Sequence, residues 1–340
     1  MNGVLHLPPD LDPVAALVAD ALARVEQRFD SALASDTGPV NELCAHVERY
    51  RGKMLRPILA ILSGVACAPD AADAFARGDA ASLVSEDLIT VAAVCEMVHM
   101  ATLVHDDVLD EADTRRRART VNALRGNEPA VMLGDYLIAT AFHLCSSLDS
   151  QLAALAVGRA SRATCAGELL QLAHREDLDL DEPTYFEIVA GKTGALTEVA
   201  CELGALCAIA PAPARDALAT YGRSLGVAFQ IQDDLLDLRA TEAQTGKPVG
   251  KDLEKGKLTL PIIHHLRAAD PAQRERSLAL VRAHDPAIGA ALALTGSVEY
   301  AERTARRLVD EAKKNLGELP ETPARGVLDR LAEAVINRSC

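Results

Sequence analysis

Apolar residues recur at helical spacing along almost the whole chain, and this pattern constrains the fold more than any other feature. Alanine and leucine dominate the apolar positions, and no run of alternating β-branched residues interrupts them. Alternation with a period of two is typical of a half-buried strand, so a sheet is not expected as the framework. The sequence therefore predicts an all-α protein, one large bundle of about a dozen helices.

Helix starts are indicated where an aspartate that can cap a helix precedes a proline, at Asp12, Asp270 and Asp285. We expect helices near residues 13–33, 41–67, 83–112, 129–148, 151–175, 183–209, 213–239, 258–269, 271–284, 286–294, 297–317 and 322–337. Loops are expected at 68–81, 116–128 and 240–257, and the last is a candidate lid. No change of composition marks a domain boundary, so we expect residues 1–340 to form a single domain. We assign no chemistry to residues 1–40 of this domain.

Charge and composition exclude several classes of protein. With 35 Lys and Arg against 49 Asp and Glu, the net charge of −14 disfavours nucleic acid or an anionic membrane as a partner. The longest uncharged apolar stretch, residues 203–214, is too short to span a bilayer, and the acids Asp10 and Asp12 disfavour a signal peptide. The eight cysteines contain no CxxC pair, which favours reduced core thiols. We therefore expect a cytoplasmic protein without an integral membrane segment.

Two acidic pentapeptides repeat one pattern, Asp106-Asp107-Val108-Leu109-Asp110 and Asp233-Asp234-Leu235-Leu236-Asp237. Each ends an apolar helical run. On a helix the first and last acids of each lie about 40° apart around the axis and about 6 Å apart along it, so they share one face. A single such cluster is equally typical of a solvated helix end. Two copies at the ends of apolar runs favour binding of a hard cation such as Mg²⁺.

Basic and histidine side chains accompany the acids. His99 precedes Asp106 by seven residues, which places it about 20° around the helix from Asp106, on the same face. A lone histidine on an apolar helix is usually a core residue. Because this one shares a face with carboxylates, we expect it to have a role in the site. Gly191 and Gly194 flank Lys192 and Thr193 within a helical run, which predicts either a local break that directs the ammonium inward or a helix boundary. The other basic residues near these motifs are equally typical of solvent-exposed surface charge. They are Arg51, Lys53, Arg56, Arg115, Arg116, Arg117, Lys247, Lys251, Lys255 and Lys257.

Charge balance indicates what these groups bind. Six carboxylates and one diphosphate are too negative to be held together without compensation. About three Mg²⁺, together with Arg115, Lys192, Lys247 and Lys257, bring the total near zero. The sequence therefore favours a diphosphate held by metal ions between two acidic helix ends.

The motifs also form an ordered set that resembles a known family. In chain order they are Gly52-Lys53-x-x-Arg56-Pro57, Glu96-x-x-His99, Asp106-Asp107-x-x-Asp110, Arg115-Arg116, Gly134-Asp135, Gly167-Glu168-x-x-Gln171, Lys192-Thr193, Phe229-Gln230-x-x-Asp233-Asp234-x-x-Asp237, Gly250-Lys251-Asp252-Leu253 and Gly256-Lys257-x-Thr259-Leu260-Pro261. This set is similar to the trans-type (all-E) polyprenyl diphosphate synthases, most of all their long-chain bacterial members.

The resemblance implies a prenyltransferase with the isoprenoid synthase fold, a helical bundle around a deep central cavity, in a homodimer. It implies that isopentenyl diphosphate is bound by Lys53, Arg56, His99 and Arg116. The allylic diphosphate would be bound by Arg115, Lys192, Thr193, Gln230, Lys247 and Lys257. About three Mg²⁺ would be bound mainly by Asp106, Asp110 and Asp233, supported by Asp107, Asp234 and Asp237. With Lys192, these groups would stabilise the leaving diphosphate.

Product length is expected to depend on Ala101 and Thr102, five and four residues before Asp106. Short-chain members of the family place aromatic residues there, and residues 83–112 contain none, which favours a product of six or more isoprene units for a quinone side chain. The alternative is a twenty-carbon geranylgeranyl product, which is expected if Met100, Met132, Leu133 or Leu137 closes the tunnel that holds the growing prenyl chain. A terpene cyclase is disfavoured by Lys53, Arg56 and the second cluster, and a non-catalytic synthase subunit by the retention of both clusters.

Overall fold

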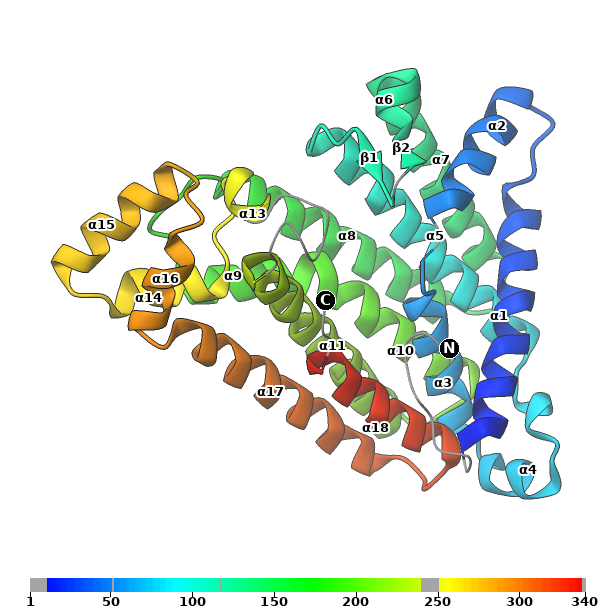
Figure 1. Cartoon of the computed structure of the whole chain (residues 1–340). Helices are drawn as coiled ribbons and strands as arrows, with labels where there is room; N and C mark the ends of the chain where they lie inside the picture. Colours follow the sequence, from blue (N-terminus) through cyan, green and yellow to red (C-terminus); the bar gives the residue numbers. More distant parts are fainter. Residues whose placement is uncertain (1–10, 51, 117, 240–250, 338–340) are drawn as a thin grey trace. The chain divides into compact units, whose positions relative to one another are not determined.

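The computed structural model describes residues 11–50, 52–116, 118–239 and 251–337. These residues are almost entirely helical, which confirms the predicted all-α class (Figure 1). The strands in this described part are β1 (Thr114–Arg115) and β2 (Ala118–Arg119), which form one short antiparallel hairpin. The fold is therefore built from helix packing alone.

The chain divides into two compact units, each formed by segments that are distant in sequence. Unit 1 comprises Met1–Ser161, Leu196–Gly222 and Leu316–Arg330, and unit 2 comprises Arg162–Ala195, Arg223–Asn315 and Leu331–Cys340. The helices α8 (Gln151–Ala173), α10 (Ala195–Cys207), α11 (Ala212–Arg239) and α18 (Pro323–Ile336) contain residues of both units. The single domain expected over residues 1–340 stays a prediction.

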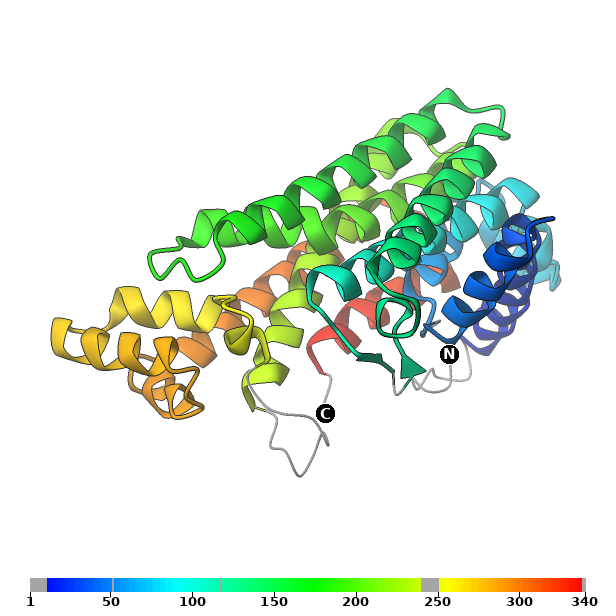
Figure 2. The ribbon, with the colours of Figure 1, turned by 90° about the horizontal axis from the view of Figure 1, so that it is seen from above.

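The central helix of unit 1 is α5 (Glu86–Leu109), which packs against α1, α3 and α7 (Figures 1 and 2). It begins where the Ser85 hydroxyl accepts a hydrogen bond from the N–H of Leu88 (3.2 Å). It is long and apolar enough to cross a membrane, but 78% of its apolar window is buried within the protein, as in a core helix. The other elements are α1 (Asp12–Leu33), α2 (Gly38–Val47), η2 (Glu48–Tyr50), α3 (Leu55–Cys67), α4 (Ala71–Arg77), η3 (Ala80–Leu83), α6 (Val121–Arg125), α7 (Asn127–Ser146) and η5 (Leu316–Glu318).

The predicted helix over residues 41–67 is wrong, because the chain forms α2, η2 and α3 with a turn between them. Met54 has a φ of +52°, a left-handed conformation that a continuous helix excludes. Pro57 lies in the first turn of α3, where its missing N–H is tolerated. The turn places Lys53 just before α3, which is largely buried, and Arg56 within the first turn of that helix.

All three predicted loops contain helical residues. Residues 68–81 include α4, whose Ala71 and Ala74 are buried, because alanine favours helix and these side chains have a core to pack against. Residues 116–128 include β2 and α6, which begins where Thr120 Oγ1 accepts from the N–H of Ala123 (3.3 Å). In the predicted loop 240–257, residues 240–250 lie outside the described residues, and Lys251–Glu254 form the short helix α13.

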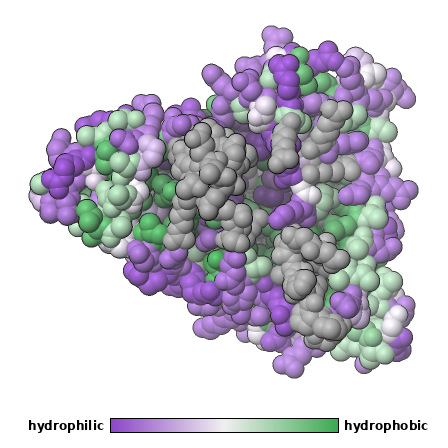
Figure 3. Space-filling model, in the orientation of Figure 1, coloured by the Kyte–Doolittle hydropathy of each residue, from purple (hydrophilic) through white to green (hydrophobic). Residues whose placement is uncertain are grey.

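Unit 2 is built around α14 (Leu260–Ala268), which packs against α9, α15, α16 and α17. Ile262, Ile263 and Leu266 belong to its buried core. The last of these partners, α17, buries Ala301, Ala305 and Val309, while hydrophilic side chains cover its visible surface in Figure 3. The elements are α9 (Glu182–Val189), the π-helical turn η4 (Ala190–Gly194), α13, α14, α15 (Pro271–Arg282), α16 (Ile288–Leu294) and α17 (Ser297–Asn315).

Seven of the eight cysteines lie in the described part of the chain, and all seven are free thiols. Cys44, Cys67, Cys95, Cys145 and Cys201 are buried, which confirms the predicted core thiols at these positions. Burial raises the pKa of Cys67 to about 11. These side chains therefore pack as small apolar groups.

Candidate active site

Arg56, His99 and Arg116, three of the four residues predicted to bind isopentenyl diphosphate, lie close together in unit 1. The Arg116 guanidinium lies directly over Gly52, where a Cβ atom would overlap it. Burial, followed by the positive charges of Arg56, Arg116 and Arg115, lowers the pKa of His99 well below its ordinary value. A neutral His99 can still donate one hydrogen bond, while the arginines supply the positive charge that an anion needs.

Arg56 has an incomplete hydrogen-bond environment. Its Nε is buried without a hydrogen-bond partner. Burial lowers the pKa of Arg56, and the charge of Glu96, a buried residue of α5, opposes that shift. Because an unpaired buried donor is costly, the position fits an acceptor such as a phosphate oxygen.

The three acids of the first cluster differ in their surroundings. Asp106 and Asp110 are partly exposed, and Asp110 follows the last residue of α5. Asp107 is only 1% exposed and accepts a hydrogen bond from Nε of Arg115 at 2.9 Å. In this structure Asp107 therefore holds the arginine of the following hairpin.

The hairpin with Arg115 and Arg116 is connected to the core of unit 1 through the start of α6. The Val121 N–H donates to the buried hydroxyl of Tyr50 (3.0 Å). The Asn122 amide donates to the carbonyl oxygens of Asp107 and Ala112, both at 3.2 Å. Because Asn122 and Arg115 both bind Asp107, the first acidic cluster and the arginine hairpin keep a fixed relative position.

The residues expected to control product length lie on α5. Ala101 is fully buried, and the Thr102 hydroxyl donates to the carbonyl oxygen of His99 at 2.7 Å. Met100, Leu133 and Leu137 are also buried, whereas Met132 is 64% exposed and does not close a tunnel inside unit 1. The path of the prenyl chain along α5 stays a prediction.

In unit 2, Lys192 lies in the π-helical turn η4, where the sequence predicted either a local break or a helix boundary. A Cβ atom on Gly167 of α8 would lie 2.7 Å from the Lys192 backbone nitrogen, so the close approach of α8 to η4 requires glycine. Lys192 Nζ donates to Gln171 Oε1 (2.9 Å) and forms an ion pair with Glu168. The ammonium thus lies against side chains of α8 and remains partly exposed.

A chain of hydrogen bonds connects η4 to the second acidic cluster. Thr193 Oγ1 donates to Gln230 Oε1 at 2.9 Å, and Gln230 Nε2 donates to Asp234 Oδ1 at 2.9 Å. The Tyr185 hydroxyl donates to Asp234 Oδ2 at 2.7 Å. Burial and the charge of Asp234 raise the pKa of Tyr185 well above its ordinary value, so this hydroxyl remains a donor. Asp233 and Asp237 are partly exposed, whereas Asp234 is 4% exposed.

A fourth carboxylate lies beside this cluster. The backbone N–H of Asp252 donates to Asp237 Oδ2 at 3.1 Å. Burial, and then the charge of Asp252, raise the pKa of Asp234 from 3.8 to about 8. Burial and Asp237 likewise raise the pKa of Asp252, against the opposing charges of Lys257, Lys255 and Lys192. Carboxylates and lysines therefore lie close to one another within a small region of unit 2.

Some of these residues line a cavity of about 210 Å³ in unit 2. Its walls include Lys192, Thr193, Gln230, Asp234, Asp252 and Lys257. The volume is below the roughly 300–1,000 Å³ of common ligand sites, so within this unit the cavity suits a polar head group rather than a whole prenyl chain. Lys247, also predicted to bind the allylic diphosphate, lies outside the described residues.

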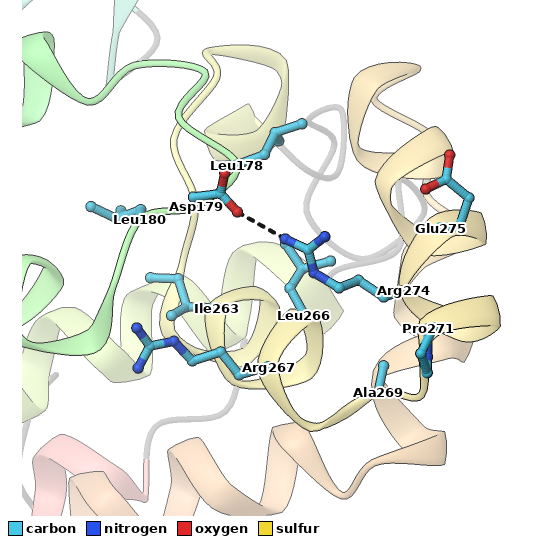
Figure 4. A pocket seen from close by; sticks show the side chains of 10 residues that line it. All are labelled: Leu178, Asp179, Leu180, Ile263, Leu266, Arg267, Ala269, Pro271, Arg274 and Glu275. Carbon is cyan, nitrogen blue, oxygen red and sulfur yellow. Dashed lines mark hydrogen bonds and ion pairs between the residues drawn. The ribbon is translucent and has the colours of Figure 1, made fainter.

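A second cavity of unit 2, of about 590 Å³, lies between residues 178–180, α14 and the start of α15 (Figure 4). An ion pair between Arg274 and Asp179 (2.8 Å) crosses it. It shares Leu180 with the smaller cavity, and none of the predicted site residues lines it. Of the two cavities, only the smaller one is therefore lined by residues predicted from the sequence, namely Lys192, Thr193, Gln230, Asp234 and Lys257.

The donor set fits Mg²⁺ that a bound phosphate helps to coordinate. Within the described residues no three His, Cys, Asp or Glu side chains are close enough to hold a metal ion by themselves. Mg²⁺ is usually bound by one or two carboxylates plus substrate phosphates, rather than by a cage of protein ligands. Burial, and then a neighbouring carboxylate, raise the pKa of both Asp234 and Asp252, and a bound cation would offset this cost of holding the two charges.

Four contributors were not assigned a role from the sequence. Asp252 stands in the Gly250-Lys251-Asp252-Leu253 motif, and Glu168 and Gln171 stand in another, so their place in the ordered set was the available signal. Tyr185 had no signal, because a tyrosine on an apolar helix is usually a core residue. Its contact with Asp234, 49 residues away in sequence, is visible only in the fold.

Removing metal ions should make stability depend on pH through Asp234. Since its pKa rises from 3.8 when unfolded to about 8 when folded, the native state binds the extra proton in this range. Stability should therefore be present at low pH and fall as pH rises from about 4 to 8, by at most about 1.4 kcal/mol per pH unit.

In EDTA we expect the melting temperature to fall by roughly 2–4 °C per pH unit between pH 6 and 8. Asp234→Asn should flatten this slope. Asp310→Asn, at an exposed position of α17, is the matched control and should keep it. A wild-type melting temperature that is constant over this range would contradict a protonated Asp234.

Comparison with known proteins places the chain in a family. The family model for Polyprenyl synthetase matches residues 38–293. The chain is 34% identical over 335 residues to the octaprenyl diphosphate synthase of Escherichia coli (strain K12), an alignment that covers 97% of this chain and 99% of that protein.

Solved structures agree with this match. A decaprenyl diphosphate synthase from Rhodobacter capsulatus has a TM-score of 0.86 at 33% identity, with 96% of this chain and 98% of that chain covered. A polyprenyl synthase from Caulobacter crescentus CB15, complexed with calcium and isoprenyl diphosphate, has a TM-score of 0.83 at 30% identity, with 96% and 98% covered. Because the family match spans most of the chain and these relatives align over nearly their whole length, the chain belongs to the polyprenyl synthetase family of prenyltransferases.

Proposed function

We propose that the protein is a Mg²⁺-dependent synthase that adds isopentenyl diphosphate to an allylic diphosphate, releasing diphosphate and forming a long-chain all-trans polyprenyl diphosphate. The observation that carries this proposal is the small cavity of unit 2, which Lys192 and Lys257 line together with Asp234 of the second cluster and Asp252. Basic and acidic side chains together suit a diphosphate bound with divalent cations. The family match restricts the chemistry to prenyl transfer.

In this proposal most of the binding groups form two sets, one in each unit. In unit 1, Lys53, Arg56, His99 and Arg116 would bind isopentenyl diphosphate, and the unpaired Nε of Arg56 supports this role. In unit 2, Lys192, Thr193, Gln230 and Lys257 would bind the allylic diphosphate. Two further cations, Arg115 and Lys247, are proposed for the same diphosphate.

The metal sites would use the partly exposed acids. Asp106 and Asp110 of unit 1, and Asp233 and Asp237 of unit 2, are the side chains that a cation can reach. The buried Asp107 and Asp234 would support them. About three Mg²⁺, when bound with substrate, would neutralise charge on the leaving diphosphate.

The proposed reaction balances without a protein nucleophile. The bond between the allylic C1 and the diphosphate oxygen breaks, and the electron pair leaves with the diphosphate. The double bond of isopentenyl diphosphate attacks C1, and one proton is then lost from the condensed product, with the diphosphate as its acceptor. Lys192 and Lys257 would bind the oxygens on which negative charge develops.

A long product and a homodimer are part of the proposal. The octaprenyl and decaprenyl synthases that the chain resembles support a product of six or more isoprene units. Exposed apolar side chains of unit 1, Val131 and Met132 on α7 and Leu152 and Leu155 on α8, support a second copy of the chain as partner. We propose a cytoplasmic location and no nucleic acid partner.

Diphosphate release tests the reaction class. We expect release from an allylic diphosphate only when isopentenyl diphosphate and Mg²⁺ are both present, with EDTA abolishing it. Release from the allylic diphosphate alone would identify a cyclase, and no release under any condition would identify a non-catalytic subunit. Mass spectrometry of the product measures its length, and a twenty-carbon product would contradict the long-chain assignment.

A further inference from the structure

A buried tyrosine lies beside the small cavity of unit 2, at a position with no assigned chemistry. Tyr185 on α9 is 4% exposed and lines the cavity. Its hydroxyl donates to Oδ2 of Asp234 at 2.7 Å. A hydrogen bond between a neutral donor and a buried carboxylate is among the stronger side-chain interactions. Tyr185 therefore fixes the position of Asp234 on α11.

The other carboxylate oxygen of Asp234 also has a protein donor. Gln230 Nε2 donates to Asp234 Oδ1 at 2.9 Å. Both oxygens of Asp234 thus accept from side chains of unit 2, and the residue is almost fully buried. Its neighbours Asp233 and Asp237 are partly exposed. This arrangement suits Asp234 to orienting other side chains and leaves the neighbours to face a ligand.

Asp234 determines which end of the Gln230 amide faces Thr193. With the proposed cations bound, Asp234 would be ionised, and a carboxylate only accepts hydrogen bonds, so Gln230 must direct its Nε2 toward Asp234. The amide oxygen then faces the other way and accepts from Thr193 Oγ1 at 2.9 Å. If Asp234 moved, the amide could rotate and the Thr193 hydroxyl would lose its acceptor. Thr193 directly follows Lys192 in η4, so the effect would reach the proposed diphosphate site.

We propose that Tyr185 is a positioning residue for the proposed diphosphate–Mg²⁺ site: through Asp234 and Gln230 it holds the second acidic cluster and Thr193 in their binding arrangement. This inference rests on the proposed function. It assigns Tyr185 no contact with substrate. It separates the three acids of the second cluster into ligands, Asp233 and Asp237, and a support, Asp234.

Tyr185→Phe tests the proposal, because it removes the hydroxyl and keeps the ring. We expect the affinity for inorganic diphosphate with Mg²⁺, measured by calorimetry, to fall by about 10-fold or more, in the range seen when outer-shell partners of metal ligands are removed. In steady-state assays the KM for the allylic diphosphate should rise similarly. The KM for isopentenyl diphosphate should change by less than about twofold, since its proposed residues belong to unit 1.

Tyr300→Phe is a matched control within unit 2. The Tyr300 hydroxyl donates to Glu182 Oε2 at 2.7 Å, and Glu182 lies on α9, the helix of Tyr185. This variant removes an equivalent tyrosine–carboxylate bond and should leave both binding measurements unchanged. A second variant, Asp234→Asn, keeps the side-chain shape but puts an amide where the carboxylate was, and should reproduce the pattern of Tyr185→Phe.

Three results would overturn the positioning role. One is unchanged diphosphate–Mg²⁺ affinity in Tyr185→Phe. Another is an equal rise of both KM values, which indicates a general structural effect. The third is an equal effect of Tyr300→Phe. Calorimetry measures binding at the site without turnover, so it tests the positioning role independently of the reaction. Failure of the wild-type protein to condense the two substrates would refute the proposed function instead.

Discussion

Asp106→Ala and Asp233→Ala should each lower kcat/KM for condensation by at least about 10²–10³-fold, the loss seen when one preorganised group that stabilises transition-state charge is removed. Each of these acids begins its cluster and is partly exposed, so it can reach a cation. Without it the charge on the leaving diphosphate would be compensated poorly. Both variants should remain folded, because removing a partly exposed carboxylate creates no buried cavity.

The matched controls use the same helices at positions away from the clusters. Asp87→Ala on α5 and Asp216→Ala on α11 replace exposed aspartates and should retain wild-type turnover. Thermal melts show whether each variant is folded, and stopped assays of diphosphate release measure turnover. Near-normal Mg²⁺-dependent turnover in either cluster variant would refute its assignment as a metal ligand.

The two acidic clusters have the same pattern of burial, and this pattern follows from the positions of the acids in each pentapeptide. In each pentapeptide the second acid is buried, Asp107 at 1% and Asp234 at 4% exposure, while the first and last acids are partly exposed. Adjacent residues on a helix point about 100° apart, whereas the first and fifth share a face. When the shared face is accessible, the second acid turns toward the interior. Periodicity alone could therefore have separated the partly exposed acids from the buried ones.

The partners of the buried acids could not be predicted in this way. Asp107 pairs with Arg115 from a hairpin, and Asp234 pairs with Tyr185 from another helix. A buried carboxylate needs such donors, but the sequence does not say which of several candidates the fold brings near. The ordered motifs identified Asp252 and Gln171 only as members of a set. Their contacts depend on how helices pack, which local patterns do not encode.

Fold prediction succeeded and failed for related reasons. Helices such as α5 and α17 were predicted within a few residues, because their apolar pattern at helical spacing is long. The predicted helix over 41–67 failed at Met54, which has a left-handed backbone although methionine favours helix. There the packing of Tyr50 and the turn that presents Lys53 and Arg56 override local preference.

Ala101→Phe should shorten the product, from six or more isoprene units to a smaller number. Ala101 is fully buried on α5, about one turn and a half before Asp106, where the proposed prenyl chain would pass. A phenyl ring there would fill the space that a growing chain needs. If a tunnel lies beside Ala101, the ring is accommodated with little loss of stability, whereas in a fully packed core it would cost roughly 1–3 kcal/mol.

Ala92→Phe separates these two outcomes. Ala92 is also fully buried on α5, and nine residues place it about 180° around the helix from Ala101. It should destabilise the protein without changing the distribution of product lengths. Mass spectrometry of the products and thermal melts of both variants give the comparison. If Ala101→Phe loses stability as Ala92→Phe does and its products keep the wild-type length, the prenyl chain does not run along this face of α5, and length must be set elsewhere.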